Sequence, residues 1–377
     1  MKYRKFGTSD WKVSALGFGI MRMPHHEGDE SRLLEEECRS MVRHAIDSGV
    51  NYIDTAYNYH GGGSEQFLGR ALDGGYRDRV RLATKLPCWM IESGADFDRI
   101  FDEQLERLKT DRIDYYLLHG LQRDWWDQLK DYGYREWAER RIADGRIGHA
   151  AFSFHDRLPL FKRIVDEWDL WSMALVMYNY MDVQYQAGAE GVKYAFDRGL
   201  AVVAMEPLRG GLLAGKPPAS VKRVFDRSGI SRTPADWALQ WLWDQPEVSC
   251  VLSGMSSMEQ LRQNIASAER SGVGTLSDQE RDLLAAVREE YSSKKPVDCT
   301  GCRYCMPCPE GVAIPHILSI YNLGRMYEAE DTARWHYSFV GEENRPGACT
   351  ECGQCMEKCP QHLDIVELLR TAHTCLA

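Results

Sequence analysis

Residues 51–72 read NYIDTAYNYHGGGSEQFLGRAL and contain one complete strand–loop–helix unit. The first part, NYIDTA (51–56), is a short apolar and β-branched run that is typical of a strand. A glycine-rich loop follows, and SEQFLGRAL (64–72) has apolar residues at the spacing of an amphipathic helix. A strand followed at once by a helix is the repeating unit of a parallel α/β sheet.

Similar units occur on both sides of this one, and together they predict an α/β protein. Eight strand–helix units favour right-handed crossovers that close into a (β/α)₈ TIM barrel. An open doubly wound sheet is the alternative, but its first turn normally reads G-x-G-x-x-G, and GFGIMR (17–22) lacks the third glycine. The other predicted strands are VSALGFG (13–19), RVRLATKL (79–86), IDYYLLHG (113–120), HAAFSF (149–154), MALVMYN (173–179), AVVAMEP (201–207) and VSCVLSG (248–254).

The two ends of the chain depart from this repeat. Residues 1–14 resemble a β-hairpin with a turn at Thr8–Asp10, which we expect to plug the bottom of the barrel. SSKKP (292–296) breaks the helical pattern and precedes a cysteine-rich region. We therefore predict a barrel domain over residues 1–290 and a smaller, largely helical domain over residues 291–377.

Charge and hydropathy exclude some classes of function. The formal net charge is −10, and no basic stripe is present to meet phosphates, so we expect no nucleic-acid partner. The N-terminus has no signal-peptide pattern, and no stretch approaches the roughly 20 apolar residues of a membrane helix. We expect a cytoplasmic protein without a membrane partner.

Eight of the twelve cysteines lie between Cys299 and Cys359, in the motifs CTGCRYCMPCP (299–309) and CTECGQCMEKCP (349–360). Three cysteines at C-x₂-C-x₂-C wrap one [4Fe–4S] cluster, and a fourth before proline reaches the other cluster. We therefore predict two clusters, one held by Cys299, Cys302, Cys305 and Cys359, the other by Cys349, Cys352, Cys355 and Cys308.

The two motifs resemble those of two-cluster bacterial ferredoxins, which implies a ferredoxin-like domain over residues 291–377. The first motif departs from them with two residues, not three, before its last cysteine. The long separation between the motifs contains SIYNLGRMYEAEDTARWHY (319–337), which is expected to be helical. Zinc is the alternative, but zinc sites use cysteine pairs, and triplets with two-residue gaps fit poorly around one tetrahedral ion.

Four polar side chains fall at the C-terminal ends of consecutive predicted strands, where (β/α)₈ barrels carry their chemistry. Asp54 and Tyr59 follow the second strand. Lys85 ends the third strand and His119 ends the fourth. Each alone has a structural explanation, such as a helix cap or a solvated surface group, but all four are expected to meet at one barrel mouth.

Tyr59 is the candidate for proton transfer to a carbonyl oxygen. With an ordinary pKa of about 10, a tyrosine is a poor acid–base group at neutral pH. We expect the Lys85 cation to lower that pKa, and the Asp54 carboxylate to hold Lys85 charged. His119 can donate a hydrogen bond that orients the carbonyl oxygen. This predicts Tyr59 as the acid for reduction, or the base for oxidation.

The same stretches resemble the aldo/keto reductase family over roughly residues 1–275. The resemblance is carried by residues 51–59, by Ser64-Glu65…Leu68-Gly69, by Thr84-Lys85 and by Leu117-Leu118-His119. It implies an Asp, Tyr, Lys and His tetrad on Asp54, Tyr59, Lys85 and His119, and a nicotinamide cofactor bound without a Rossmann loop. The implied cofactor contacts are Ser153, Asn179, Pro207, Leu208, Gly210, Gly211, Gly254, Ser256, Gln260 and Asn264.

Three positions depart from the family pattern and leave the cofactor open. Phe154 replaces an amide-binding Asn, Met205 a stacking Tyr, and Gln260 an Arg that grips a 2′-phosphate. NADP is favoured only slightly over NAD, and a flavin stays an alternative.

Two interpretations stay open for the aromatic residues that follow the third and fourth strands. Trp89, Trp125 and Trp126, with Tyr132 and Tyr134, either pack the loops or line a substrate wall.

These observations predict an oxidoreductase that reduces a small-molecule carbonyl or oxidises an alcohol with NAD(P)H, with clusters of structural, sensing or electron-transfer role. One alternative is a flavin enzyme fed by the clusters, with a redox partner such as a ferredoxin, because clusters move single electrons and a nicotinamide moves a hydride. The other is a non-enzymatic iron–sulfur protein on a degenerate barrel, which the intact tetrad disfavours.

Overall fold

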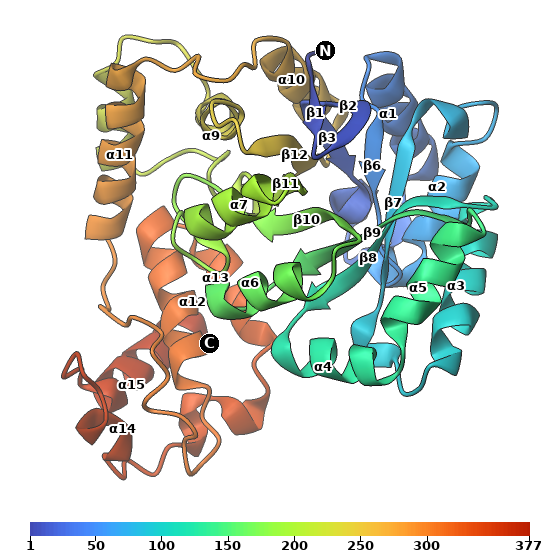
Figure 1. Cartoon of the computed structure of the whole chain (residues 1–377). Coiled ribbons are helices and arrows are strands. Elements are labelled where there is room, and N and C mark those ends of the chain that lie inside the picture. The colour runs from blue at the N-terminus through green and yellow to red at the C-terminus, as the bar shows by residue number, and fades with distance from the viewer. The chain divides into compact units, whose positions relative to one another are not determined.

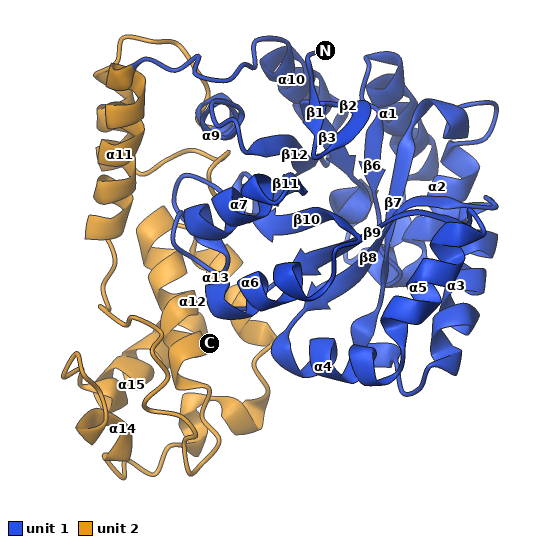
Figure 2. Ribbon diagram, viewed as in Figure 1, with its two compact units in different colours: residues 1–211, 235–277 blue, residues 212–234, 278–377 orange.

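The computed structural model describes residues 1–377 and divides into two compact units (Figures 1 and 2). Unit 1 comprises Met1–Gly211 and Ala235–Ser277, and unit 2 comprises Leu212–Pro234 and Asp278–Ala377. This division does not coincide with the predicted domain boundary at residue 290, which stays a prediction. No helix in the chain combines the length and apolar character needed to span a membrane.

Unit 1 is a closed barrel of eight parallel strands, which confirms the predicted fold class. Each strand pairs with the next one along the chain, and the last pairs with the first through Val251 and Leu16. The strands are β3 (Leu16–Gly19), β6 (Tyr52–Asp54), β7 (Arg81–Leu86), β8 (Ile113–Leu121), β9 (Ile147–Phe154), β10 (Trp171–Met177), β11 (Ala201–Met205) and β12 (Val248–Gly254).

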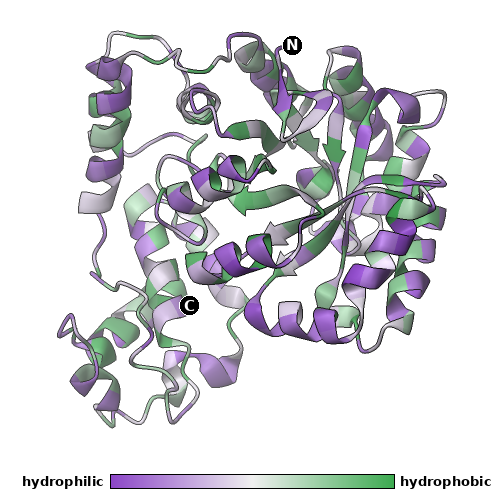
Figure 3. Ribbon diagram, viewed as in Figure 1, coloured by the Kyte–Doolittle hydropathy of each residue, from purple (hydrophilic) through white to green (hydrophobic).

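The strands are apolar because both of their faces are covered. Figure 3 shows the barrel strands mostly in the hydrophobic colour, while the surrounding helices carry hydrophilic segments. An inner cluster that includes Tyr52, Tyr115 and Leu175 fills the barrel, and a larger outer cluster packs the helices onto it. The helices of unit 1 are α1 (Glu35–Asp47), α2 (Ser64–Ala71), α3 (Ala95–Leu108), α4 (Arg123–Asp131), α5 (Tyr134–Ala143), α6 (Leu158–Glu167), α7 (Gly188–Asp197), α9 (Pro234–Trp243) and α10 (Met258–Glu269).

The N-terminal hairpin is formed by β1 (Tyr3–Phe6) and β2 (Ser9–Ser14), which pair antiparallel. The ring of Phe6 lies 5.1 Å from that of Tyr115 and 6.1 Å from that of Tyr52, so the hairpin covers the lower end of the barrel interior. Its turn lies at Gly7–Thr8, not at Thr8–Asp10. Gly7 takes a φ of 56°, and a Cβ there would lie 2.6 Å from the carbonyl oxygen of Gly199. A second small sheet pairs β4 (His25–His26) with β5 (Asp29–Leu33).

Unit 2 is largely helical, as expected for the C-terminal region. Its core includes Ile317 and Leu318 of α12 together with Ile365 and Leu369 of α15. The predicted helix over residues 319–337 is interrupted because Glu328 takes a left-handed conformation with φ 49°. The helices are α8 (Ala219–Asp226), α11 (Asp278–Ser293), α12 (Ile314–Tyr327), α13 (Glu330–Ser338), α14 (Gln354–Glu357) and α15 (Ile365–Leu376).

Candidate functional site

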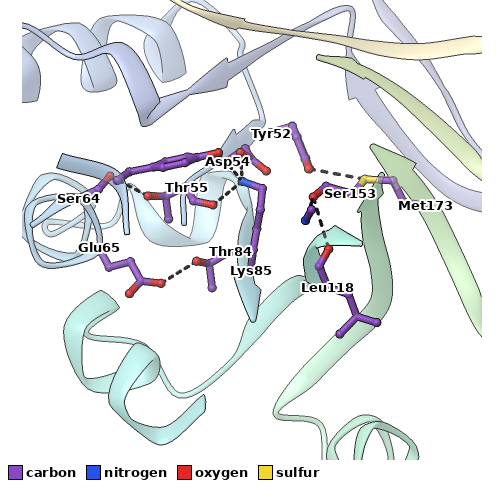
Figure 4. A network of polar contacts seen from close by, with 12 residues as sticks. Tyr52, Asp54, Thr55, Ser64, Glu65, Thr84, Lys85, Leu118, Ser153 and Met173 are labelled. Atoms are coloured by element: carbon purple, nitrogen blue, oxygen red, sulfur yellow. Dashed lines mark hydrogen bonds and ion pairs between the residues drawn. The ribbon is translucent and has the colours of Figure 1, made fainter. Parts of the chain in front are cut away.

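Lys85 is the centre of a polar cluster at the C-terminal ends of β6 and β7 (Figure 4). Its side chain is 1% exposed, and its Nζ lies 2.5 Å from Asp54 Oδ1 and 2.7 Å from the carbonyl oxygen of Thr55. Burial alone would lower the pKa of the Lys85 ammonium, but the Asp54 charge and the interactions with Asp54 and Tyr59 outweigh burial and raise the pKa. Lys85 therefore stays charged inside the protein.

Tyr59 comes to Lys85 from the loop after β6. Its Oη lies 3.3 Å from Lys85 Nζ, and its ring is 5.9 Å from the ring of His119 in an edge-on arrangement. The next residue, His60, is buried with φ 53° and anchors the loop, since its Nδ1 and Nε2 each lie 2.9 Å from a backbone oxygen, those of Glu30 and Ile20. All four predicted tetrad residues are thus gathered at one barrel mouth.

His119 is a neutral imidazole in this setting. Burial lowers the pKa of His119 well below its ordinary 6.5, and the nearby Lys85 charge acts in the same direction. Its Nδ1 is buried and has no hydrogen-bond partner. Nε2 is therefore the nitrogen left to face the mouth, where a proton on it can be donated to a ligand oxygen.

The pKa of the Tyr59 phenol shifts in the direction opposite to the one expected from the sequence. Burial raises the pKa of Tyr59 above its ordinary value of 10.0, and the Lys85 charge opposes this shift without cancelling it. The prediction of a lowered pKa is therefore wrong, because the loss of water around the phenol outweighs the attraction of the cation for a phenolate. At neutral pH Tyr59 holds its proton, which suits a proton donor.

These two pKa shifts predict a flat pH profile for carbonyl reduction. His119 becomes charged only below its lowered pKa, thus below 6.5, and Tyr59 loses its proton only above its raised pKa, thus above 10.0. The turnover number for reduction should change little between these limits, whereas alcohol oxidation needs the phenolate and should rise with pH through the alkaline range. Initial rates in both directions across this range check the prediction, and a fall in the reduction rate near neutral pH contradicts it.

A second buried network supports the strand that carries Lys85. The Glu65 carboxylate, fully buried in α2, accepts hydrogen bonds of 2.6 Å from Thr84 Oγ1 and from Gln104 Nε2. Gln104 Nε2 also donates to the carbonyl oxygen of Lys85 at 3.0 Å, and Arg107 lies 3.4 Å from the carboxylate. Figure 4 shows Glu65 and Thr84 beside the Lys85 cluster.

Removing the Glu65 carboxylate should be strongly destabilising. Glu65→Ala leaves Thr84, Gln104 and Arg107 without their shared acceptor, so we expect the free energy of unfolding to fall by about 3 kcal/mol. Urea denaturation measures the loss. Glu36→Ala is the matched control, because the Glu36 side chain is 86% exposed and its ion pair with Arg39 contributes little. Equal midpoints for the two variants contradict the prediction.

Ser153 and Asn179, two implied cofactor contacts, are buried and hydrogen-bonded within the protein. Ser153 Oγ accepts from the backbone N–H of Gly120 at 2.6 Å. Asn179 Nδ2 donates to Asp182 Oδ2 at 3.1 Å, and its Oδ1 accepts from two backbone N–H groups at 3.0 Å. Both side chains therefore already have a role in shaping the loops at the mouth.

The segment after β12 leads into the N-terminus of α10. Ser257 caps that helix by accepting from the N–H of Gln260, and Gln260 Oε1 accepts from the N–H of Ser256 at 2.9 Å. Asn264 Nδ2 lies 3.3 Å from Ser253 Oγ, and Gly254 is exposed. The first turn of this helix offers the backbone donors and dipole that favour an anion.

One arginine, Arg22, lies near both the turn after β11 and Gly254. Pro207 is buried, Leu208 packs on the barrel core, and Gly210 and Gly211 are exposed with positive φ. Arg22 NH2 lies 3.6 Å from where a Cβ on Gly210 would be, and Arg22 Cβ lies 3.3 Å from where a Cβ on Gly254 would be. Arg22 also pairs with Glu206 at 3.6 Å.

The departures from the family pattern have different surroundings. Phe154 points away from the barrel interior, with its ring 5.1 Å from that of Phe161 on α6. Met205, the last residue of β11, is partly buried against the cluster that fills the barrel.

The tryptophans after β7 and β8 split between the two interpretations left open. Trp126 is fully buried, and its Nε1 donates to Glu167 at 2.7 Å, so it packs the fold, as does buried Tyr134. Trp89, in the short helix η4 (Cys88–Met90), is 43% exposed and lies 5.1 Å from the His119 ring. Trp125 lies 6.1 Å from Trp89. These two rings border the mouth.

The eight motif cysteines line two cavities within unit 2. One cavity is lined by Cys299, Cys302, Cys305 and Cys359, with Ile314 and Leu318 of α12. The other is lined by Cys305, Cys308, Cys349, Cys352 and Cys355, with Ile314 and Leu369. Each cavity thus draws thiols from both motifs. No group of three or more His, Cys, Asp or Glu side chains is arranged to hold a single metal ion.

Sequence reasoning missed several side chains at the mouth. Arg22 lies just beyond β3, and His155 directly follows β9, so their positions at strand ends were the available signal. Gln186, whose Nε2 lies 3.4 Å from His155 Nδ1, comes from a long loop and carried no signal in the sequence.

Comparisons with known proteins agree with this geometry. Residues 15–288 match the aldo/keto reductase family, and residues 298–363 match a 4Fe-4S dicluster domain. An uncharacterized oxidoreductase, YqkF of Bacillus subtilis, is 28% identical over 71% of this chain and 91% of its own length. L-galactose dehydrogenase of Arabidopsis thaliana is 27% identical over 71% of this chain and 88% of its own length. 6-dehydroglucose reductase of Novosphingobium aromaticivorans is 28% identical over 65% of this chain and 83% of its own length.

Among solved structures, the holo form of aldo-keto reductase AKR11C1 from Bacillus halodurans superimposes with a TM-score of 0.63 at 28% identity. The match covers 76% of this chain and 96% of that one. The closed barrel and the cysteine motifs thus agree with the family matches, and the chain belongs to the aldo/keto reductase family, with a 4Fe-4S dicluster domain following the barrel.

Proposed function

We propose that this oxidoreductase interconverts a small-molecule carbonyl and its alcohol with NAD(P)H, using Tyr59 as the proton donor for reduction. The observation that carries the proposal is the position of Lys85 Nζ, 2.5 Å from Asp54 and 3.3 Å from the Tyr59 hydroxyl. A buried phenol that retains its proton beside a fixed ammonium is suited to protonate an oxygen on which negative charge develops. His119 orients that oxygen from the side.

Several groups at the mouth suit the charged part of a nicotinamide cofactor, which supplies the hydride when bound. Arg22 lies against Gly210 and Gly254, and the N-terminus of α10 follows two residues after Ser256. A guanidinium, exposed glycines and a helix N-terminus are a donor set that matches a diphosphate. Position 260, where an arginine would grip an NADP 2′-phosphate, holds Gln260, whose Oε1 accepts from the N–H of Ser256, so the proposal includes NAD as well as NADP.

The substrate class follows from the chemistry and from the named relatives. Two of them are a dehydrogenase of L-galactose and a reductase of 6-dehydroglucose. A polyhydroxylated carbonyl compound or its alcohol is therefore the substrate class that we propose for this chain.

For unit 2 we propose two [4Fe–4S] clusters. Cys299, Cys302, Cys305 and Cys359 line one cavity, and Cys308, Cys349, Cys352 and Cys355 line the other together with Cys305. Since Cys305 lines both cavities, assigning it to the first gives each cluster four thiols. The clusters have a structural, sensing or electron-transfer role. Because a cluster carries single electrons, electron transfer would use a one-electron partner such as a ferredoxin. The clusters favour an oxygen-poor cytoplasm.

Anaerobic purification followed by analysis of iron, sulfide and extracted cofactors tests both halves of the proposal. We expect iron and acid-labile sulfide in equal amounts, no released flavin, and oxidation of NADPH or NADH that depends on an added carbonyl. Zinc in place of iron overturns the cluster assignment. Released flavin without any nicotinamide-dependent turnover overturns the barrel chemistry in favour of the flavin alternative.

A further inference from the structure

The two cysteine cavities of unit 2 differ in how far their thiols are exposed to solvent. Cys352 is the one exposed cysteine among the eight motif cysteines, and the other seven are partly buried. It lines the cavity assigned to the second cluster, together with Cys349 and Cys355. In the proposed assignment, the second cluster therefore has one corner at the protein surface, whereas the thiols of the first cluster are all partly covered.

The local backbone does not account for this difference. Cys352 lies between Glu351 and Gly353, which have φ values of 56° and 76°. Its counterpart in the first motif, Cys302, lies between two residues that both have a φ of 67°. The chain therefore curves in the same left-handed way around both cysteines, and the difference between the two cavities lies in the groups around them.

Carboxylates surround the exposed thiol. Glu310 is exposed and lines the cavity of Cys352, and the hydroxyl of Thr350 donates to Glu310 Oε1 at 3.4 Å. This contact holds the Glu310 carboxylate next to the segment that carries Glu351, whose side chain is 62% exposed. Arg370 pairs with Glu351 at 2.8 Å but is shared with a second carboxylate, that of Glu367. The charge around the exposed thiol is therefore negative.

The cavity of the first cluster has the opposite charge. Arg303 lines it, and no acidic side chain does. Lys358 is the basic side chain that lines the cavity of the second cluster, against the two carboxylates beside Cys352. Residues 298–377 as a whole contain eleven acidic and six basic side chains. The two clusters of this chain would thus present surfaces of different sign to an approaching protein.

We infer that the surface formed by Cys352, Glu310 and Glu351, called the Cys352 face below, is where the second cluster exchanges single electrons with a small carrier protein whose contact surface is positively charged. The inference rests on the proposed [4Fe–4S] clusters. Complementary charge around an exposed redox centre speeds and orients the encounter, and redox complexes are small and short-lived. An acidic carrier is repelled from this face.

Oxidised cytochrome c, a small basic protein with a one-electron haem, is a suitable probe of the Cys352 face. Dithionite supplies the electron to the clusters beforehand, and the excess is removed. One electron then leaves the reduced second cluster, and one ferric haem iron becomes ferrous. No bond is formed or broken and no proton moves, so the step balances with these two proteins alone.

The rate of this step tests the charge and the position of the face. In anaerobic stopped-flow mixing at low ionic strength, Glu310→Gln/Glu351→Gln should lower the second-order rate constant about fivefold. The control Glu330→Gln/Asp331→Asn removes the same charge from α13 and should leave the rate constant nearly unchanged. The wild-type rate should fall as salt is added. Equal rates for the two double variants, or a wild-type rate that rises with salt, overturn the inference.

Cross-linking locates the contact without relying on electron transfer. A carbodiimide joins the lysines of cytochrome c to nearby carboxylates, and the linked peptides should contain Glu310 or Glu351. Links confined to Glu330 and Asp331 overturn the inference. Arg303→Gln should not raise the rate of cytochrome c reduction, and a several-fold rise contradicts the Cys352 face because it places the contact at the first cluster.

Metal analysis separates the failure of this inference from the failure of the proposed clusters. A wild-type chain without iron and acid-labile sulfide overturns the clusters and the Cys352 face together. A chain that contains both, and whose cross-links and rates do not depend on Glu310 and Glu351, overturns the Cys352 face alone. Carbonyl turnover in the barrel enters neither measurement.

Discussion

Tyr59→Phe is expected to lower kcat/KM for carbonyl reduction by about 10³-fold or more. The substitution removes the hydroxyl that lies 3.3 Å from Lys85 Nζ and keeps the ring that faces His119. Because the change deletes a proton donor and little volume, the protein should fold as before. Steady-state NADPH oxidation with a saturating aldehyde measures the loss, and cofactor binding should stay within about twofold of wild type.

The matched control for this variant is Tyr57→Phe in the same loop. The Tyr57 hydroxyl donates to Glu103 at 3.0 Å and lies outside the Lys85 cluster. Its loss should leave kcat/KM nearly unchanged. A Tyr59→Phe protein that retains a tenth of wild-type turnover removes Tyr59 from the proton-transfer step, whatever Tyr57→Phe does.

Cys308→Ser should remove one cluster and keep the other. Cys308 shares its cavity with Cys349, although these residues belong to different motifs. Serine is a much poorer ligand for a cluster iron than a thiolate, so iron and sulfide per chain should fall by about half. Cys375→Ser changes a cysteine of α15 that lies outside both cavities and should leave the iron content intact.

The double variant Cys308→Ser/Cys349→Ser decides which thiols share a cluster. If both bind the same cluster, the double variant loses no more iron than either single variant. If each motif holds a cluster of its own, the double variant loses nearly all iron, and the assignment of Cys308 to the cluster of the second motif is wrong. Iron and sulfide analysis with the visible spectrum distinguishes these outcomes.

The barrel strands could be predicted from sequence because each is a short apolar run whose pattern reflects burial on both faces. Local pattern failed where a backbone conformation depended on a distant contact. The turn at Gly7 is shaped by the carbonyl oxygen of Gly199, and the helix break at Glu328 has no glycine or proline to mark it.

The residues of the candidate site could be predicted from the sequence, but the direction of the Tyr59 pKa shift could not. Strand ends indicated Asp54, Tyr59, Lys85 and His119, because parallel strands bring their C-terminal ends to one mouth. The direction of the Tyr59 pKa shift depends on how deeply the phenol is buried, which no sequence pattern reports. Gln186 orients His155 from a loop remote in sequence, and such a contact exists only once the chain is folded.

The mixed composition of the two cysteine cavities has a consequence for how unit 2 acquires its structure. In the proposed assignment, iron bound in both cavities would tie the chain near residue 300 to the chain near residue 355. Each cluster would then act as an inorganic cross-link that closes the loop carrying α12 and α13. In that assignment, neither motif supplies all four thiols of a cluster by itself. Cluster insertion and helix formation should therefore occur together, and newly synthesised chains starved of iron should leave this region open to proteases while the barrel stays closed.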